Sequence, residues 1–152
     1  MNWMTANDAP VWLPALNAAE AQYGIPTNLL ARIAFQESSF RPEVIDGSER
    51  SPDNCIGIMQ LNPTFYPNAG DSPDNDIETA AQLVSALHRQ FQDWQLVLAA
   101  YNWGSGNVRR SFLRHQNQYV LDAFPVETQN YVRQVVADVP VPGCLVPIGE
   151  PS

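Results

Sequence analysis

The chain has 152 residues, of which 45% are hydrophobic and 16% are charged, and its formal net charge is −8. This length allows one ordinary domain with a single core, and the hydrophobic content argues against a disordered chain because burial can offset chain entropy. The acidic balance argues against nucleic acid or an anionic membrane as a partner, since a polyanion is repelled at long range. No stretch approaches the ~20 apolar residues of a membrane span, and the N-terminus has no export signal.

The chain has two cysteines, Cys55 and Cys144, and two histidines, His88 and His115, whose thiol and imidazole groups could bind a metal. Their spacing matches none of the clusters that bind zinc or iron and sulfur, so we expect no metal and no cofactor. A disulfide between the two cysteines and two free thiols are equally compatible with the sequence.

The first predicted helix lies behind Pro10, where apolar residues recur at helical spacing from Trp12 to Tyr23, and Gly24 supplies a stop. The next stretch predicts a second helix that Pro26 opens and Pro42 ends. Its apolar stripe includes one ionisable residue, Glu37.

The segment 41–76 is rich in Pro, Asp, Ser and Asn and is predicted to be a long loop, with a short strand or turn only at 56–61. Asn75 and Glu78 form a plausible capping pair for an amphipathic helix that continues to Phe91. Further helices are predicted at 96–101, 108–113 and 126–139. Prolines then forbid regular structure, so the predicted organisation is one domain over 1–139 and an extended Pro-rich tail over 140–152.

Glu37 is the best candidate for acid–base chemistry. A carboxyl that is partly buried among apolar neighbours disfavours its charged form, which suits a proton donor near neutral pH. Position on a helix alone favours the other interpretation, a solvated residue at the edge of the stripe. The choice between these readings depends on the motifs around Glu37.

Four motifs occur in a fixed order: Glu37-Ser-Ser-Phe, Gly57-Ile-Met-Gln-Leu, Ala100-Tyr-Asn-Trp-Gly and Glu127-Thr-Gln-Asn-Tyr-Val, with Ser51-Pro52 before the second. Together they resemble the soluble lytic transglycosylase family. The resemblance implies an all-α, mainly helical fold like that of goose-type lysozyme, with a short β-hairpin or irregular loop near Ile56–Leu61. It also implies peptidoglycan glycan strands as the substrate.

The same resemblance implies a role for each matched residue. Glu37 is the catalytic acid and base, Ser51 contacts the muramyl N-acetyl group, and the residues implied to bind substrate or line its groove are Ser51, Met59, Gln60, Tyr101, Asn102 and Glu127. In the family the matching tyrosine hydrogen-bonds near the glutamate. Without the motifs, core packing would explain Met59 and Tyr101, and turns, solvent or capping would explain the others.

The implied reaction is lytic cleavage of the MurNAc-GlcNAc β-1,4 bond with formation of 1,6-anhydroMurNAc. It suits a sequence without an obvious second catalytic carboxylate beside Glu37, because glycoside hydrolases ordinarily use two. A hydrolytic muramidase on the same fold and an inactive peptidoglycan-binding component are the alternatives.

The absence of an export signal favours a bacteriophage lysin or virion-associated enzyme acting in the periplasm or cell wall, with a secretion-system assembly as the other setting. The stretch 43–50 is longer than the usual family loop, which leaves one cleft wall undefined.

Overall fold

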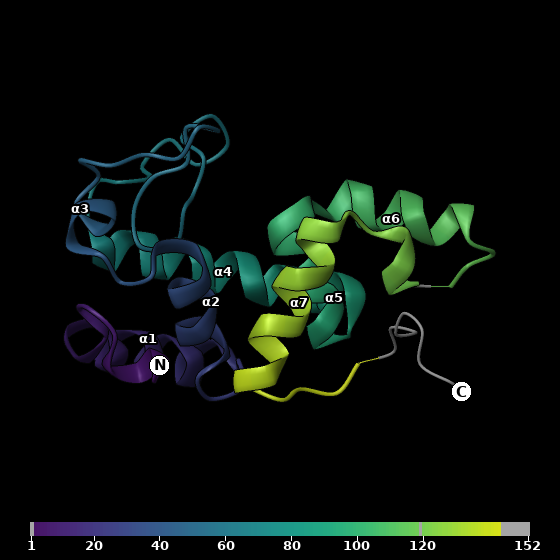
Figure 1. The fold of residues 1–152 in the computed structure, drawn as a ribbon, viewed down its shortest axis with the longest axis horizontal. Helices are drawn as coiled ribbons and strands as arrows, with labels where there is room; N and C mark the ends of the chain where they lie inside the picture. Colours follow the sequence, from purple (N-terminus) through teal and green to yellow (C-terminus); the bar gives the residue numbers. More distant parts are fainter. Residues whose placement is uncertain (1, 119, 144–152) are drawn as a thin grey trace. The chain divides into compact units, whose positions relative to one another are not determined.

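The computed structural model describes residues 2–118 and 120–143. Cys144 and most of the predicted tail over 140–152 therefore lie outside the described residues. Within the described part of the chain all regular elements are helices, which confirms the predicted all-α fold class (Figure 1). The elements in chain order are η1 (Trp3–Thr5), α1 (Ala9–Tyr23), α2 (Leu29–Ser38), α3 (Pro42–Ile45), α4 (Pro73–Phe91), α5 (Trp94–Trp103), α6 (Ser105–Arg114), η2 (Leu121–Ala123) and α7 (Val126–Asp138).

The chain divides into two compact units, Met1–Ser85 and Ala86–Ser152. The first contains η1 and α1 to α3 with most of α4, and the second contains the end of α4 and all later elements.

In the first unit, α1 has the predicted boundaries to within a few residues. Pro10 lies in its first turn, and Gly24 ends it in the left-handed conformation with φ of 67°. That conformation carries no steric penalty for glycine, which explains why the helix stops there. α1 packs against α2 and η1.

The predicted start of the second helix was wrong, because α2 begins at Leu29 and not near Pro26. Its N-terminus is held by Glu20 of α1, whose carboxyl oxygens accept hydrogen bonds from the backbone N–H groups of Asn28 (2.8 Å) and Ala31 (2.9 Å). The helix ends at Ser38, and Pro42 opens the short helix α3 inside the segment predicted to be a loop. Proline at the first helical position loses no hydrogen bond.

The predicted cap of α4 was also wrong. The Ser72 side chain, and not Asn75, caps this helix by accepting a hydrogen bond from the Asn75 N–H at 3.0 Å. Tyr23 of α1 donates a hydrogen bond to the Glu78 carboxyl, which joins α4 to the first helix. The largest fully buried hydrophobic side chains of the first unit are those of Leu16, Leu29, Leu30, Ile33, Phe40, Ile58, Met59 and Val84.

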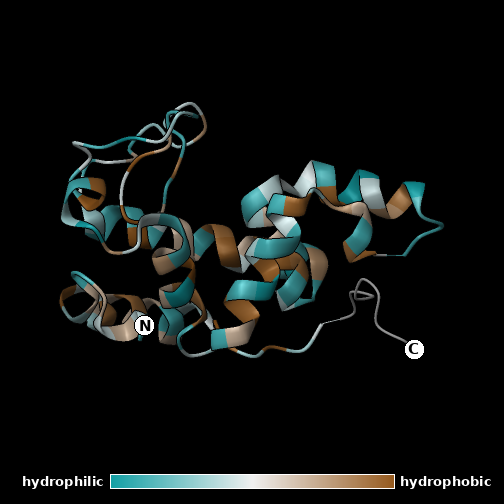
Figure 2. Ribbon diagram, viewed as in Figure 1, coloured by the Kyte–Doolittle hydropathy of each residue, from teal (hydrophilic) through white to brown (hydrophobic). Residues whose placement is uncertain are grey.

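In the second unit, α5 packs against both α6 and α7. It begins two residues earlier than predicted, because the Asp93 side chain accepts a hydrogen bond from the Leu96 N–H at 2.9 Å, and it ends before Gly104. α6 is longer than predicted at its N-terminus, and α7 matches the prediction to one residue. Hydrophobic and hydrophilic segments alternate along these helices (Figure 2), and Leu96 through Ala100 are buried.

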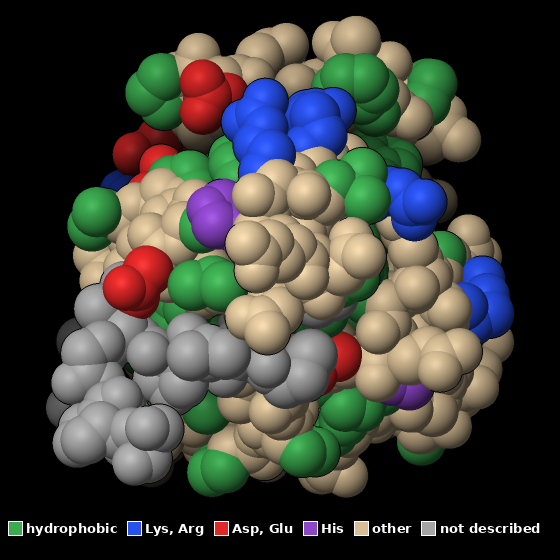
Figure 3. Space-filling model, turned by 90° about the vertical axis from the view of Figure 1, so that its right-hand side faces the viewer, with side chains coloured by type: hydrophobic (Ala, Val, Ile, Leu, Met, Phe, Trp, Pro, Cys, Tyr) green, Lys and Arg blue, Asp and Glu red, His purple; other side chains and the backbone are tan. Residues whose placement is uncertain are grey.

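The charge is divided unevenly along the chain. Eleven of the sixteen acidic residues but only three of the eight basic residues fall within 1–85. All eight basic residues are arginine, and three of them, Arg109, Arg110 and Arg114, are exposed on α6. The face in Figure 3 shows basic side chains near its top and along its right-hand side, and acidic ones mainly at its left. The negative net charge therefore belongs to the first unit.

Candidate functional site

Glu37 lines a cavity of about 230 Å³ in the first unit. Two more of the sequence-predicted residues, Ser51 and Gln60, line the same cavity. These three residues are separated by up to 23 positions in the sequence, so it is the tertiary structure that brings them together. The complete lining consists of Glu37, Arg41, Val44, Glu49, Arg50, Ser51, Pro52 and Gln60.

The end of α2 positions Glu37. The helix stops one residue later, at Ser38, and the next two residues, Ser39 and Phe40, both have left-handed backbone angles, with φ of 54° and 55°. Phe40 is fully buried, and its ring contacts that of Phe35. The buried ring anchors the chain reversal, so Glu37 is presented half-buried at the end of a fixed helix.

Ser51 is held in a tight turn with Cys55. The Ser51 hydroxyl accepts a hydrogen bond from the Cys55 N–H at 3.0 Å, and the Ser51 N–H donates to the Cys55 carbonyl at 3.2 Å. Burial raises the pKa of the Cys55 thiol, Ser51 lowers it, and the negative charge of Glu37 raises it further. Ser51 and Glu37 line the same cavity, so this turn lies close to the predicted acid.

Gln60 lies in the predicted hairpin, which the structure forms as an antiparallel bridge between Ile56 and Leu61. The two residues exchange backbone hydrogen bonds of 3.0 and 3.1 Å. The turn between them requires left-handed angles at Gly57 (φ 85°) and Gln60 (φ 51°), and the Gln60 side chain folds back to donate to the Gly57 carbonyl at 3.0 Å. The turn therefore fixes the Gln60 amide.

Met59, in the same turn, is placed differently from the expectation. Its side chain is fully buried and it is absent from the cavity lining. Met59 is buried together with its neighbour Ile58, whereas Gln60 is half-buried. Its position agrees with a packing role.

One wall of the cavity is an ion-pair cluster that the sequence analysis missed. Arg41 pairs with Glu43 and Glu49 through contacts of 2.7 Å, and both oxygens of Glu49 accept hydrogen bonds from the guanidinium group of Arg41. These acidic neighbours raise the pKa of Arg41. Glu43 and Glu49 lie in the stretch 43–50, which is longer than the usual family loop, but nothing in the residue pattern indicated their pairing with Arg41.

Tyr101, Asn102 and Glu127 belong to the second unit. Tyr101 and Asn102 are half-buried on α5, and the Asn102 side chain accepts a hydrogen bond from Thr128 of α7 at 2.8 Å. Glu127 is exposed in the first turn of α7. That these three residues lie close to Glu37 remains a prediction.

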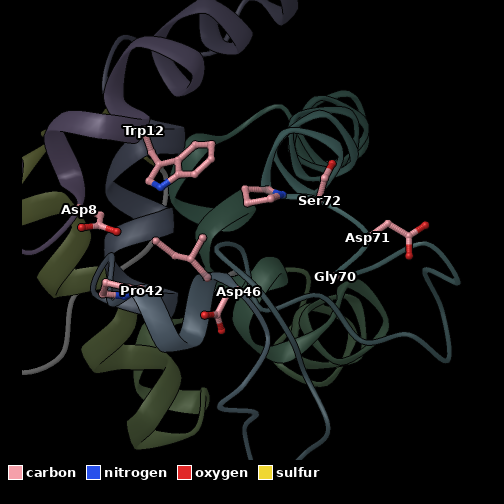
Figure 4. Close-up of a pocket in the computed structure, with 9 residues that line it drawn as sticks. Asp8, Trp12, Pro42, Asp46, Gly70, Asp71 and Ser72 are labelled. Carbon is pink, nitrogen blue, oxygen red and sulfur yellow. The ribbon is translucent and has the colours of Figure 1, made fainter.

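A second and larger cavity of the first unit, about 430 Å³, contains none of the motif residues (Figure 4). Its lining comes from the start of α1, from α3 and from the loop before α4, and includes Asp8, Trp12, Pro42, Asp46, Asp71 and Ser72. Size alone would select this cavity, but Glu37, which the motifs predict to be the catalytic acid, does not line it.

Within the described residues, no group of three or more His, Cys, Asp or Glu side chains could hold a metal ion. In the same part of the chain, no helix combines the length and hydropathy needed to cross a membrane.

Comparison with known proteins connects this geometry to a family. Residues 14–120 match the family described as Transglycosylase SLT domain, a range that includes Glu37, Ser51, Gln60, Tyr101 and Asn102 but ends before Glu127.

The curated relatives include proteins named membrane-bound lytic murein transglycosylase C. The relative from Serratia proteamaculans is 26% identical over 124 residues, which cover 66% of this chain and 33% of the relative. Those from Yersinia enterocolitica and Sodalis glossinidius are 26% and 25% identical and cover 72% and 70% of this chain. The chain spans about a third of the length of these relatives. Because the family match covers more than half of its residues, the chain belongs to the transglycosylase SLT domain family.

Proposed function

We propose that the chain is a peptidoglycan lytic transglycosylase that cleaves the MurNAc-GlcNAc β-1,4 bond and forms 1,6-anhydroMurNAc. The observation that carries the proposal is the cavity shared by Glu37, Ser51 and Gln60 in a chain of this family. The names of the relatives describe the same activity for those proteins.

In the proposed reaction, the Glu37 carboxyl gives its proton to the glycosidic oxygen, and the bond between that oxygen and the muramyl anomeric carbon breaks. The GlcNAc side leaves with a free 4-hydroxyl. The 6-hydroxyl of the muramyl residue then loses its proton to Glu37 and bonds to the anomeric carbon. Water is not consumed, and Glu37 is returned to its starting state. Intramolecular attack has effective molarities that reach ~100,000 M or more in a good geometry, so it can compete with water.

The alternative is a hydrolytic muramidase on the same fold, which would need a second carboxylate as base or nucleophile. Glu49 lines the cavity and is the obvious candidate. Both of its oxygens are engaged by Arg41, at 3.3 and 2.7 Å. A carboxylate bound in this bidentate way is a poor nucleophile, which favours the lytic reaction.

The first prediction concerns the product. Digestion of purified peptidoglycan should release muropeptides that end in 1,6-anhydroMurNAc, each one water lighter than the hydrolysis product, and mass spectrometry of the digest measures this. Borohydride treatment should leave these ends unchanged. The variant Glu49→Gln should keep most of the activity, because its carboxylate takes no part in the proposed reaction. Reducing ends that borohydride converts to muramitol, together with loss of activity in Glu49→Gln, would establish the hydrolase instead.

The biological setting suggested by the sequence, a bacteriophage lysin or virion-associated enzyme, remains a prediction. The relatives reported above are from bacteria and are named as membrane-bound. Peptidoglycan is the partner that we propose in either setting.

A further inference from the structure

Asp76 lies at the start of α4 and is a fully buried acidic residue, with no exposed surface. One carboxyl oxygen, Oδ1, accepts a hydrogen bond from the Gly70 N–H at 2.9 Å. The other, Oδ2, is buried without a hydrogen-bond partner. Leaving a buried polar atom unpaired is costly, so this placement calls for an explanation.

The unpaired oxygen faces Gly57. A Cβ atom built on Gly57 would collide with Oδ2 of Asp76, and Gly57 has a left-handed φ of 85° that most side chains avoid. Glycine therefore meets two requirements here, the backbone angle and the close approach of the carboxyl. The Asp76 side chain fills the space that a side chain at position 57 would occupy.

Gly57 is the first residue of the turn that carries Gln60. Its carbonyl accepts hydrogen bonds from both the backbone N–H (3.1 Å) and the side-chain amide (3.0 Å) of Gln60. Gln60 in turn lines the cavity of Glu37. A chain of direct contacts thus runs from Asp76 through Gly57 and Gln60 to the cavity of the candidate acid.

We propose that Asp76 is a positioning residue for the Gly57–Leu61 turn. Its side chain packs against Gly57 and accepts a hydrogen bond from the loop at Gly70, and these contacts hold the Gln60 amide in the Glu37 cavity. This inference rests on the proposed function for its effect on catalysis, but not for its effect on the turn. Burial raises the pKa of Asp76, the hydrogen bond from Gly70 lowers it, and the charge of Asp71 raises it. A neutral carboxyl fits the unpaired oxygen, because an uncharged group loses less hydration on burial.

The test compares Asp76→Ala with Asp76→Asn and with a stability control, Val84→Ala. Val84 is fully buried on the same helix and belongs to neither cavity lining described above. Asp76→Ala should lower kcat by about 10- to 100-fold with a smaller change in KM, because misplacement of a positioning group by about 1 Å can cost 100-fold in rate. Asp76→Asn keeps the shape and an acceptor for Gly70, so it should retain most of the activity. Val84→Ala should lower the melting temperature while kcat stays near that of the wild type.

The second readout is hydrogen exchange of the Ile56, Gln60 and Leu61 amides, all of which are hydrogen-bonded in the turn. It should accelerate in Asp76→Ala and not in Val84→Ala, and it does not depend on the protein being active. If Asp76→Ala fails to fold, Asp76→Ser, whose hydroxyl is too short to fill the site, takes its place.

Equal exchange and equal kcat in the Asp76→Ala and Val84→Ala variants would overturn the proposal. Equal losses of kcat in Asp76→Asn and Asp76→Ala would also overturn the proposal, because they would assign the effect to the acidic proton and not to the shape of the side chain. An inactive wild type with the expected exchange pattern would overturn the proposed function alone.

Discussion

The half-buried position of Glu37 at the end of α2 combines two properties that a general acid needs. The helix and the buried Phe40 hold its backbone in place, and the cavity gives its carboxyl access to a ligand. A hydroxyl from Ser51 and an amide from Gln60 line the same space, and neither of these groups competes with Glu37 for protons near neutral pH.

Replacing Glu37 with glutamine should therefore abolish turnover while the fold remains. The amide keeps the shape of the side chain but cannot donate and reclaim a proton, and general acid–base catalysis is commonly worth about 100- to 10,000-fold in rate. Digestion rates of purified peptidoglycan and melting temperatures measure the two effects. Glu43→Gln is the matched control and should leave the rate nearly unchanged, because the Glu43 side chain is 47% exposed and does not line the cavity. Activity of Glu37→Gln within about tenfold of wild type would remove Glu37 from this role.

At the scale of the elements, α2 depends on a neighbouring helix for its N-terminus. Asn28 precedes the helix with a left-handed φ of 72° and makes no side-chain cap. Glu20 of α1, only 1% exposed, supplies the missing acceptors, and Asn17 donates to the same carboxyl at 2.7 Å. The packing of α1 on α2 thus orients the helix that carries Glu37.

Glu20→Gln should lower the stability of the protein by about 1–3 kcal/mol. One of the two accepting oxygens becomes an amide N–H group that faces the N–H groups of α2, and leaving a buried group unsatisfied has a cost of this order. Chemical denaturation measures the free energy of unfolding. The control is Glu43→Gln, whose partner is an exposed arginine and which should change stability by less than about 1 kcal/mol. A Glu20 variant no less stable than that control would show that the cap contributes nothing.

At the scale of the whole molecule, the predicted site residues are divided between the two units. Residues 37, 51 and 60 are in the first unit and residues 101, 102 and 127 in the second. A disulfide between Cys55 and Cys144 would cross-link the units, but Cys144 lies outside the described residues and Cys55 has a free thiol in the structure.

Cys55 should therefore be alkylated without prior reduction, and faster after denaturation than in the folded protein. Burial raises the pKa of its thiol, and the thiolate is the reactive form, so at a given pH the folded protein presents less of it. Peptide mapping after iodoacetamide treatment of unreduced protein measures this at each pH. The rate in the folded protein should rise at higher pH than the rate in the denatured protein. Labelling of Cys55 that occurs only after reduction would show that the cysteine is bridged.

The sequence by itself determined the fold class and most helices, and it singled out three residues that line one cavity in the structure, while the function of that cavity stays a prediction. Amphipathic periodicity and Gly24 locate α1 and α4 because these signals are local, and motif order locates Glu37, Ser51 and Gln60 because family resemblance carries spatial information that spacing lacks. The start of α2 was mispredicted, because its cap comes from Glu20 of another helix. The cap of α4 was mispredicted as Asn75, whereas the structure uses Ser72, three residues earlier.

Only the tertiary structure decided the details around the cavity. It buried Met59 beside the partly exposed Gln60, paired Arg41 with Glu49 across eight residues, and set Asp76 against Gly57. Each of these outcomes depends on contacts between segments whose own sequences favour no particular partner. The physical reason is that burial and pairing are set by packing between distant residues, whereas propensity and capping signals act over a few neighbouring positions.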